Sequence, residues 1–452
     1  MSKDWPKVKL GTVLRLDLDR VPVDVATSYP MVGVLSFGRG LFTREPVDNG
    51  KTSYKVFYRL KAEHVVMSQL FGWEGALALS SEKFAGKFLS PQFPTFLCDT
   101  SKLDREFLGW LVRRPSLWED LGSRASGMGD RRRTLNPEAL FACEIPLPPL
   151  AEQRRIVART EALAGLIAEA KELREHAADE VKTLFASALS QACVGELTQV
   201  WRQQNPNVES ASELLARISR TKWPGQVRSR ERKPITLPQP PVTPSSWLIV
   251  EAGELQDRGA ILDIQDGNHG GDYPRKAEFG DEGVPFVTAK QIEGGTVRIG
   301  DAPKLPKDRA ELLRIGFAKA GDVLLTHNAS VGDVAIAPAD AGDFLLGTSV
   351  TYWRCNGEAL EPRYLFYFMR SEQFQRQLQF IMKQTTRNQV SVLKQVNLWI
   401  CFPPILEQRR IIEELDALEA QVGTLDHLQA ETSNELDTLI PSVLDKAFRG
   451  EL

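Results

Sequence analysis

The sequence contains few cysteines and no long apolar run. Its five cysteines lie far apart and form no Cys-x-x-Cys pair, so we expect neither a disulfide framework nor a zinc ribbon. No apolar stretch approaches the roughly 18 residues that cross a bilayer. The first residues, Met1 to Trp5, lack the apolar core of a secretory signal. These features predict a cytoplasmic protein in a reducing compartment.

The sequence also lacks a strong net charge and recognisable catalytic motifs. Its 56 Lys and Arg residues against 59 Asp and Glu residues exclude a uniformly basic surface, but not a local basic patch. Gly50-Lys51-Thr52 resembles the end of a phosphate-binding loop, yet position 45 is Glu45 where that motif needs glycine. The histidines show no metal-ligand spacing, and no Asn-Pro-Pro-aromatic tetrad of base methylation occurs. We therefore expect a non-catalytic chain with no metal or cofactor of its own.

An internal repeat organises the chain. Residues 148–197 align without a gap to residues 403–452, and 19 of the 50 aligned positions are identical. Both copies open on Pro-Pro and a Glu-Gln-Arg-Arg turn, and both close on Gly-Glu-Leu. Matching over fifty residues indicates duplication rather than a shared short motif.

Each repeated block predicts one long helix. Apolar residues recur every seven positions, which is typical of a coiled-coil seam, and the two copies are natural partners for each other. Pro441 should kink or loosen the second helix. The predicted seam residues are Ile156, Leu163, Leu184, Ile411, Leu418, Leu425 and Leu439.

A longer, more diverged block precedes each helix. Short β-branched runs, many glycines and scattered helices predict a mixed α/β (α+β) domain with a curved sheet. Between the halves, Ser210 could cap a short helix, and a basic, proline-rich stretch follows as an extended linker. The expected organisation is a first globular domain at 1–147, a helix at 148–197, a linker at 198–242, a second globular domain at 243–402 and a helix at 403–452.

Polar and basic loops occur in both globular blocks, and the basic loops of the two copies lie at corresponding positions just before the Pro-Pro boundary. Arg and Lys suit guanine edges and phosphates, whereas Asn and Gln suit adenine. A solvated loop explains any single cluster equally well, but the correspondence between the copies favours DNA. The candidate base contacts are Arg39, Arg44, Arg131 and Arg133 in the first block, and His269, Lys290, Gln291, Asn328, Arg387 and Gln389 in the second.

The repeated Pro-Pro-x-x-Glu-Gln-x-x-Ile segment resembles the specificity subunits of type I restriction–modification systems. The resemblance covers essentially the whole chain, including the Gly195-Glu196-Leu197-Thr198 helix end and the Gly321–Leu325 strand. It implies two target-recognition domains, each reading one half of an asymmetric bipartite DNA sequence, and an antiparallel coiled coil that sets their spacing.

The same resemblance implies partners that carry the chemistry. Two DNA methyltransferase subunits would dock on the chain, and restriction/translocase subunits would join them for cleavage. S-adenosylmethionine, ATP and magnesium would then be bound in those partners. Two other classes stay open from the residues alone: a stand-alone sequence-specific DNA-binding regulator, and a coiled-coil assembly protein whose globular domains bind protein.

Overall fold

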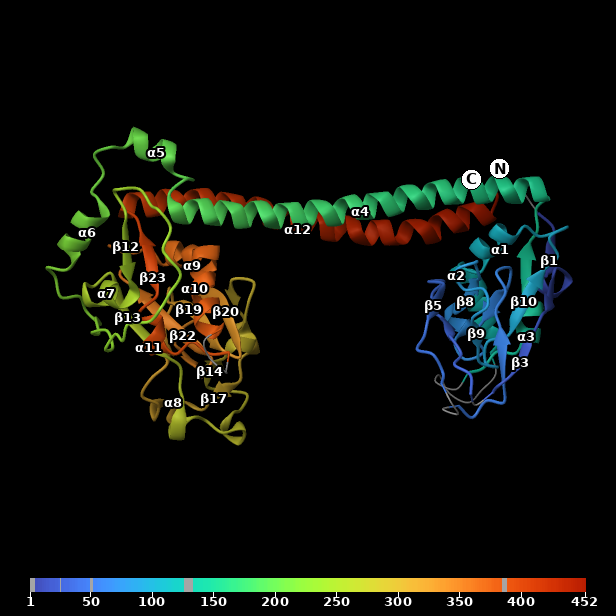
Figure 1. The fold of residues 1–452 in the computed structure, drawn as a ribbon, viewed down its shortest axis with the longest axis horizontal. Helices are drawn as coiled ribbons and strands as arrows, with labels where there is room; N and C mark the ends of the chain where they lie inside the picture. Colours follow the sequence, from blue (N-terminus) through green and yellow to red (C-terminus); the bar gives the residue numbers. More distant parts are fainter. Residues whose placement is uncertain (1–4, 25, 49–51, 126–132, 384–387) are drawn as a thin grey trace. The chain divides into compact units, whose positions relative to one another are not determined.

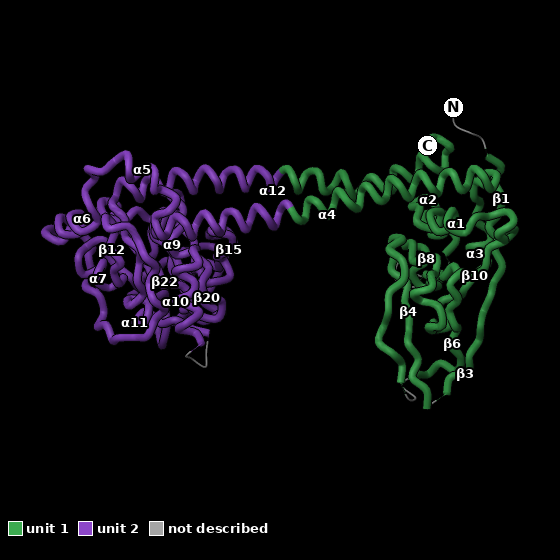
Figure 2. The backbone as a smooth tube through the Cα atoms, turned by 45° about the horizontal axis from the view of Figure 1, so that its top comes forward, with its two compact units in different colours: residues 1–176, 428–452 green, residues 177–427 purple. Residues whose placement is uncertain are grey.

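The computed structural model describes residues 5–24, 26–48, 52–125, 133–383 and 388–452 (Figure 1). The chain divides into two compact units, shown in different colours in Figure 2. The first unit consists of residues 1–176 and 428–452, and the second of residues 177–427. Two long helices, α4 (Leu150–Val194) and α12 (Ile405–Phe448), each contribute to both units.

Besides short 3₁₀ helices, the other elements described in the first unit are short strands and three short α-helices. The helices are α1 (Arg105–Leu111), α2 (Pro115–Arg124) and α3 (Pro137–Phe141). The strands are β1 (Lys7–Lys9), β2 (Leu14–Leu16), β3 (Arg20–Pro22), β4 (Val32–Val34), β5 (Leu41–Thr43), β6 (Val56–Arg59), β7 (Val65–Met67), β8 (Leu77–Leu79), β9 (Phe88–Leu89), β10 (Thr95–Cys98) and β11 (Glu144–Pro146).

The second unit carries more helix and longer strands. Its helices are α5 (Gln199–Gln204), α6 (Ala211–Ile218), α7 (Ala252–Asp257), α8 (Lys307–Glu311), α9 (Pro362–Arg370), α10 (Glu372–Lys383) and α11 (Val392–Gln395). Its strands are β12 (Leu248–Glu251), β13 (Ile261–Asp266), β14 (Val284–Val287), β15 (Ile292–Glu293), β16 (Thr296–Val297), β17 (Lys304–Leu305), β18 (Phe317–Ala318), β19 (Val323–Asn328), β20 (Ser330–Ile336), β21 (Phe344–Leu346), β22 (Val350–Cys355) and β23 (Trp399–Phe402).

The two units repeat one sheet topology. A four-stranded sheet of order β2-β10-β7-β8 in the first unit corresponds to β13-β22-β19-β20 in the second, and both sheets are antiparallel throughout. A two-stranded ladder, β1-β11 or β12-β23, precedes each long helix. The structure therefore has the mixed α/β architecture with two sheet-rich regions and long helices that the sequence predicts.

A buried glutamine explains the Glu-Gln pair at the start of each long helix. The Oε1 atom of Gln153 accepts a bond from the backbone N–H of Asp104 at 2.7 Å, and its Nε2 donates to the carbonyls of Lys102 and Pro148. Gln408 repeats this pattern with Glu361, Ala359 and Pro403. Both side chains are fully buried. Their hydrogen bonds link each long helix to the residues just before the short helix α1 or α9.

The long helices pack against the globular parts at both of their ends. In the first unit Ile156 of α4 and Phe448 of α12 share a core with Phe107 of α1, and the rings of Phe107 and Phe448 lie 4.8 Å apart. In the second unit Leu189 of α4 and Ile411 of α12 join the core beneath α9. Buried apolar area of this kind is the main source of helix stability.

The predicted seven-residue seam is wrong in part. Leu184, Leu425 and Leu439 are 69%, 44% and 41% exposed. An undistorted helix repeats every 3.6 residues, so a stripe of period seven drifts around it by about 20° per heptad. The other seam positions are Ile156 and Ile411, which are buried, and Leu163 and Leu418, which are half-buried.

The connection after α4 follows the sequence prediction. The Ser210 hydroxyl accepts a bond from the Glu213 backbone N–H, the Glu213 carboxylate accepts one from the Ser210 backbone, and α6 begins there. Residues 226–244 then run without helix or strand. Helix α12 continues through Pro441. Among the described residues, none of the helices combines the length and apolar character that a membrane crossing requires.

Candidate nucleic-acid interface

Three loops of the second unit converge at one end of the sheet β13-β22-β19-β20. The backbone N–H of His327, in β19, donates to the carbonyl of Ser349 at 2.9 Å. The Ser349 hydroxyl in turn accepts a bond from the backbone N–H of Ala289 at 2.9 Å. Ser349 thus ties the end of β19 to the loop that carries Lys290, an exposed cation.

The turn between β19 and β20 adds two of the predicted contacts. The backbone of Asn328 pairs with that of Gln389 through an isolated antiparallel bridge, so the structure brings these two residues together. Ala329 has a φ of 68°, a region that non-glycine residues rarely adopt. Its N–H donates to the carbonyl of Asn388 at 3.1 Å, which helps to hold the strained turn in place.

His269 lies at the same end of the sheet. Gly267 lies so close to the neighbouring loop that a Cβ there would fall 2.0 Å from the carbonyl oxygen of Gly347. The next residue, Asn268, bonds to the Leu346 carbonyl through its backbone N–H at 2.7 Å. His269 follows as an exposed side chain whose Nδ1 lies 3.0 Å from the Gly267 carbonyl oxygen.

The prediction that Gln291 contacts a base is wrong. Its side chain is 9% exposed, and its Oε1 accepts bonds from the backbone N–H and the hydroxyl of Thr288 at 3.0 and 2.9 Å. These bonds form a capping box around a short helical turn. The Thr-x-x-Gln spacing predicts that role. The base contact was inferred from the polar character of Gln291 without considering this spacing.

His327 is not among the candidate contacts that the sequence predicts, although it lies beside them. Its side chain is buried, and neither ring nitrogen has a hydrogen-bond partner among the described residues. Burial lowers the pKa of His327, while the carboxylate of Asp266, 3.7 Å from Nε2, opposes that shift. Its position in the polar run Thr-His-Asn-Ala-Ser was the sequence signal that could have placed His327 beside the candidate contacts.

The first unit places two predicted arginines around the short 3₁₀ helix η2 (Gly72–Glu74). The backbone N–H groups of Phe37 and Gly38 donate to the carbonyls of Glu74 and Gly75, and the Arg39 Nε donates to the Ser36 carbonyl at 3.0 Å. Arg133 lies over the ring of Trp73, 5.6 Å from its centroid. The loops of Arg39 and Arg133 therefore both pack on η2.

An exposed aromatic ring accompanies these arginines. Phe37 is 62% exposed, has a φ of 61° and lies 5.9 Å from the Arg39 guanidinium. An aromatic ring held in solvent beside a cation suits stacking on nucleobases. The glycine-hinged loop indicated the arginines but not the ring, because the exposure of Phe37 depends on the loop conformation.

Arg44 follows β5 and is exposed, with its backbone N–H bonded to the Met31 carbonyl at 2.9 Å. Arg131 and Arg387 lie outside the described residues. Among the described residues, no cluster of His, Cys, Asp and Glu side chains is arranged to hold a metal ion. Each unit thus presents basic and polar side chains on loops that its sheet holds in place.

Comparison with known proteins agrees with this arrangement. Residues 259–432 match the family described as the type I restriction modification DNA specificity domain. The chain is 22% identical to the type I restriction enzyme EcoDI specificity subunit of Escherichia coli, over 99% of this chain and 89% of that relative.

Two solved structures share the fold over nearly the whole chain. One, from a study of complex assembly and conformational transition of the type I R-M system, has a TM-score of 0.70 and covers 99% of this chain and 98% of its own. The HsdS subunit from Thermoanaerobacter tengcongensis has a TM-score of 0.57 and covers 99% and 97%. Both are 24% identical to this chain.

The fold thus defines a protein with a duplicated antiparallel sheet, and the second copy lies within the match to a DNA specificity domain. Residues 259–432 match the family model, and nearly the whole chain is similar to a specificity subunit of a type I restriction enzyme.

Proposed function

We propose that this chain recognises an asymmetric, bipartite DNA sequence and directs methyltransferase and restriction subunits to it. One observation carries the proposal: the same antiparallel sheet occurs twice, and each copy presents its own set of basic and polar loops. Two copies of one sheet that carry different loop residues suit two half-sites that differ in sequence. We take 1–147 and 243–402 as the target-recognition domains, 148–197 and 403–452 as the helices, and 198–242 as the linker.

The proposed base contacts are the exposed His269, Lys290, Arg39 and Arg44 and the partly exposed Asn328, Gln389 and Arg133. In the second unit Asn328 and Gln389 are adjacent and offer amides that match adenine, while Lys290 and His269 suit guanine or phosphate. In the first unit Arg39 and Arg44 supply the guanidinium groups, with Arg133 near η2. Arg131 and Arg387 remain candidates on sequence grounds.

The chemistry belongs to partners in this proposal. The chain itself is non-catalytic and binds no cofactor, and it acts in the cytoplasm. Two methyltransferase subunits supply S-adenosylmethionine-dependent methylation, and restriction/translocase subunits supply the ATP- and magnesium-dependent cleavage. The elements of this chain hold recognition loops in place, which is the role that a specificity subunit needs.

Methylation mapping of DNA from cells that express the whole complex tests the proposal. Asn328→Ala with Gln389→Ala should relax one half-site and leave the other unchanged, whereas Arg39→Ala with Arg44→Ala should do the reverse. Each lost bidentate base contact should cost about 1–3 kcal/mol of discrimination. Asn207→Ala, an exposed amide between α5 and α6, is the matched control and should leave the motif intact.

Three results would overturn the proposal. A palindromic methylated motif would contradict two different half-sites. A motif unchanged in both double variants would remove the assigned contacts. Tight, sequence-specific binding by the purified chain, with no change in methylation when its gene is deleted, would instead indicate a stand-alone DNA-binding regulator.

We further propose that the paired helices set the spacer between the half-sites. Their pairing is antiparallel in the first unit, where Lys171 bonds to Asp437 and Arg174 bonds to the Gln429 carbonyl. Four residues inserted after His176 and four after His427 lengthen both helices by about 6 Å. The spacer should grow by one or two base pairs with both half-sites retained. An unchanged spacer in an active complex contradicts this role.

A further inference from the structure

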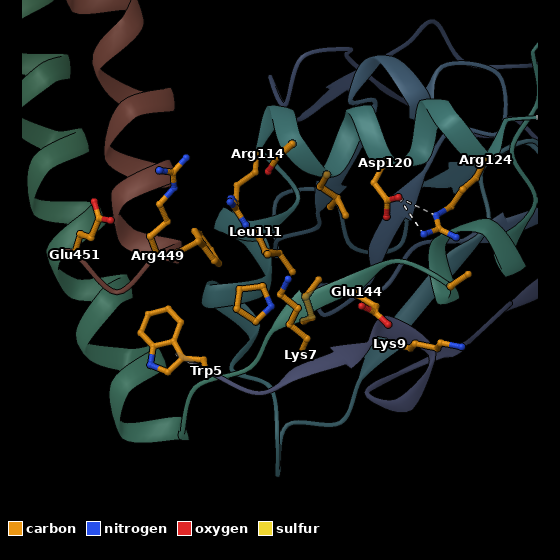
Figure 3. A pocket seen from close by; sticks show the side chains of 16 residues that line it. Trp5, Lys7, Lys9, Leu111, Arg114, Asp120, Arg124, Glu144, Arg449 and Glu451 are labelled. Atoms are coloured by element: carbon orange, nitrogen blue, oxygen red, sulfur yellow. Dashed lines mark hydrogen bonds and ion pairs between the residues drawn. The ribbon is translucent and has the colours of Figure 1, made fainter. Parts of the chain in front are cut away.

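The first unit contains an open pocket of about 880 Å³ beside the end of α12 (Figure 3). Strand β1 and the residues before it contribute Trp5, Lys7 and Lys9, and α2 contributes Asp120 and Arg124. Strand β11 and the C-terminal end of the chain complete the wall. Figure 3 shows Lys9 beside Glu144 at one end of the pocket and Arg449 with Glu451 at the other.

The internal repeat places a corresponding site in the second unit. Val8 pairs with Ile145 in the ladder β1-β11, as Val250 pairs with Ile400 in β12-β23. The next pair along is Lys9 with Glu144 in the first ladder and Glu251 with Trp399 in the second. The sites therefore correspond residue by residue, with Glu144 in the position of Trp399.

The helices beside the ladders agree with this correspondence. Leu103 to Leu111 aligns with Leu360 to Phe368, and the same offset of 257 residues pairs α2 with α10. Ser116 then corresponds to Gln373. The buried Leu117 of α2 likewise corresponds to the buried Phe374 of α10.

In the second unit the site is filled by the chain's own proline-rich linker. The indole N–H of Trp399 donates to the carbonyl of Pro238 at 3.2 Å, and Ile235 and Leu237 pack on the core of the unit. Pro244 lies against Gly195, where a Cβ would fall 2.6 Å from its ring. The cavity left between this linker, Gln373 and Trp399 is only about 130 Å³.

The open site differs from the filled one in charge. Its lining has five basic and three acidic side chains, and Arg124 is ion-paired with Asp120 at 3.0 Å. Lys7 and Lys9 are exposed, and no described residue forms an ion pair with either of them. The corresponding residues of the second unit are Ile249 and Glu251, and the linker from Ile235 to Ser245 carries no charge. The open site therefore matches an occupant with negative charge.

We propose that the pocket of the first unit binds an extended, proline-containing, acidic segment of a partner polypeptide. The occupant lies where residues 235–244 lie in the second unit, with its carboxylates next to Lys7 and Lys9. A proline-rich segment suits such a site because its backbone is already extended and loses little entropy on docking. This site is separate from the loops assigned to DNA, and the proposal does not depend on that assignment.

Fluorescence anisotropy with synthetic peptides and the full chain tests the proposal. The probe is the linker segment Ile-Thr-Leu-Pro-Gln-Pro-Pro-Val-Thr-Pro-Ser with two glutamates added at each end. It should bind the chain, and Lys7→Glu with Lys9→Glu should weaken binding by about tenfold or more, since two exposed charge pairs become repulsive. Ala142→Trp, which fills the pocket, should abolish binding.

Controls separate pocket binding from general charge attraction. Lys55→Glu reverses an exposed lysine outside the pocket and should leave the affinity unchanged. A peptide with lysines at both ends, and one with alanine for every proline, should bind at least tenfold more weakly. The thermal midpoint shows whether each variant is folded, and the exposed lysine pair serves as the test if Ala142→Trp does not fold.

The proposal fails if the Lys7 and Lys9 variant binds the acidic peptide as well as the parent chain does. It also fails if the alanine peptide binds equally, because an extended proline backbone is then not what the site recognises. Loss of DNA-fragment binding in the same variant, with peptide binding retained, would make the pocket a phosphate contact instead.

Discussion

The two units share a four-stranded antiparallel sheet and a two-stranded ladder before a long helix. They differ in the side chains that contact the start of that helix. We call the shared elements the frame. Glu407, in the first turn of α12, is buried and accepts bonds from the Thr198 hydroxyl, the Arg202 guanidinium and the Trp247 indole, the last at 2.8 Å. Its counterpart Glu152 pairs at 2.9 Å with Arg155, whose side chain is 48% exposed. The same residue at these two corresponding positions therefore contributes differently to the free energy of unfolding.

The difference arises from the segment that comes after each long helix. After α4 the chain continues into α5, which brings Thr198 and Arg202 to Glu407, and later into the linker that covers Trp399. The first unit presents an open, charged pocket at the corresponding place. Duplication thus preserved the frame, while the segment between the copies covers one of the two sites.

The largest expected effect is that of removing the buried carboxylate. Glu407→Ala leaves Arg202 without its partner in a buried network, which should lower the free energy of unfolding by about 3–5 kcal/mol. Glu152→Ala breaks the pair with the partly exposed Arg155 and should cost less than Glu407→Ala does. Denaturant unfolding followed by hydrogen exchange in each unit measures both. Equal losses would contradict the contrast drawn between the units.

The glutamine next to each glutamate should show the opposite result. Gln153 and Gln408 make the same bonds, so we expect their loss to destabilise the two units equally. Gln153→Leu and Gln408→Leu each leave three backbone groups without their side-chain partner. Each variant should lose about 2–4 kcal/mol, since a buried unsatisfied group costs about 1–3 kcal/mol. Exchange should quicken at the start of α1 in one variant and of α9 in the other. A loss in only one variant would mean that the frames are not equivalent.

The sequence alone predicts the elements whose causes are local or repeated. Ungapped identity between the copies predicted two long helices, and the Ser210–Glu213 spacing predicted the start of α6. The α/β character followed from short β-branched runs between glycines. Each of these signals lies within a few residues of the structure that it specifies.

Features that depend on distant packing could not be predicted in this way. The exposure of Leu184 reflects which face of α4 meets its neighbours, which a seven-residue pattern does not determine. Gln291 is different, because its capping partner Thr288 lies only three residues away and the Thr-x-x-Gln spacing was a local signal for that role. The filling of one groove by Pro238 arises from a contact across 161 residues of chain.

A difference in pH response should separate the units further. The position of His327 in the second unit is occupied by Gln69 in the first, when Ala62–Ser68 is aligned with Ala320–Thr326. Because burial lowers the pKa of His327, the unfolded chain takes up a proton near pH 6.5 and the folded chain resists it. The stability of the second unit should therefore fall as the pH drops below 6.5, by at most about 1.4 kcal/mol per pH unit.

The stability of the first unit should change at a lower pH than that of the second. Bonds from Lys61 and His64 lower the pKa of Asp17, so its contribution is present above about pH 3.8 and is lost as the pH falls through its depressed value. Hydrogen exchange followed from pH 7 to well below pH 3.8 covers both pH ranges and reports each unit separately. His327→Gln, which installs the residue of the first unit, should remove the response of the second. A response that survives this substitution would assign it to another group.

The smallest expected effect concerns α6, which lies in the connection between the copies. Its Leu214, Leu215 and Ile218 are buried in the core of the second unit, and the Ser210 hydroxyl accepts a bond from the Glu213 N–H. Ser210→Ala should therefore cost about 1 kcal/mol, the usual loss for a helix N-cap. Exchange should quicken about fivefold at the amides of α6, because 1 kcal/mol corresponds to that factor in a local opening equilibrium.

Asp104→Ala is the matched variant in the first unit, since the Asp104 carboxylate caps α1 through the backbone N–H groups of Glu106 and Phe107. It should cost a similar amount, with the faster exchange confined to α1. If Ser210→Ala instead quickens exchange throughout the second unit, α6 opens only together with the sheet beneath it. The linker helix would then belong to the cooperative core of that unit, and the two units would differ in the extent of their cores as well as in their covered and open grooves.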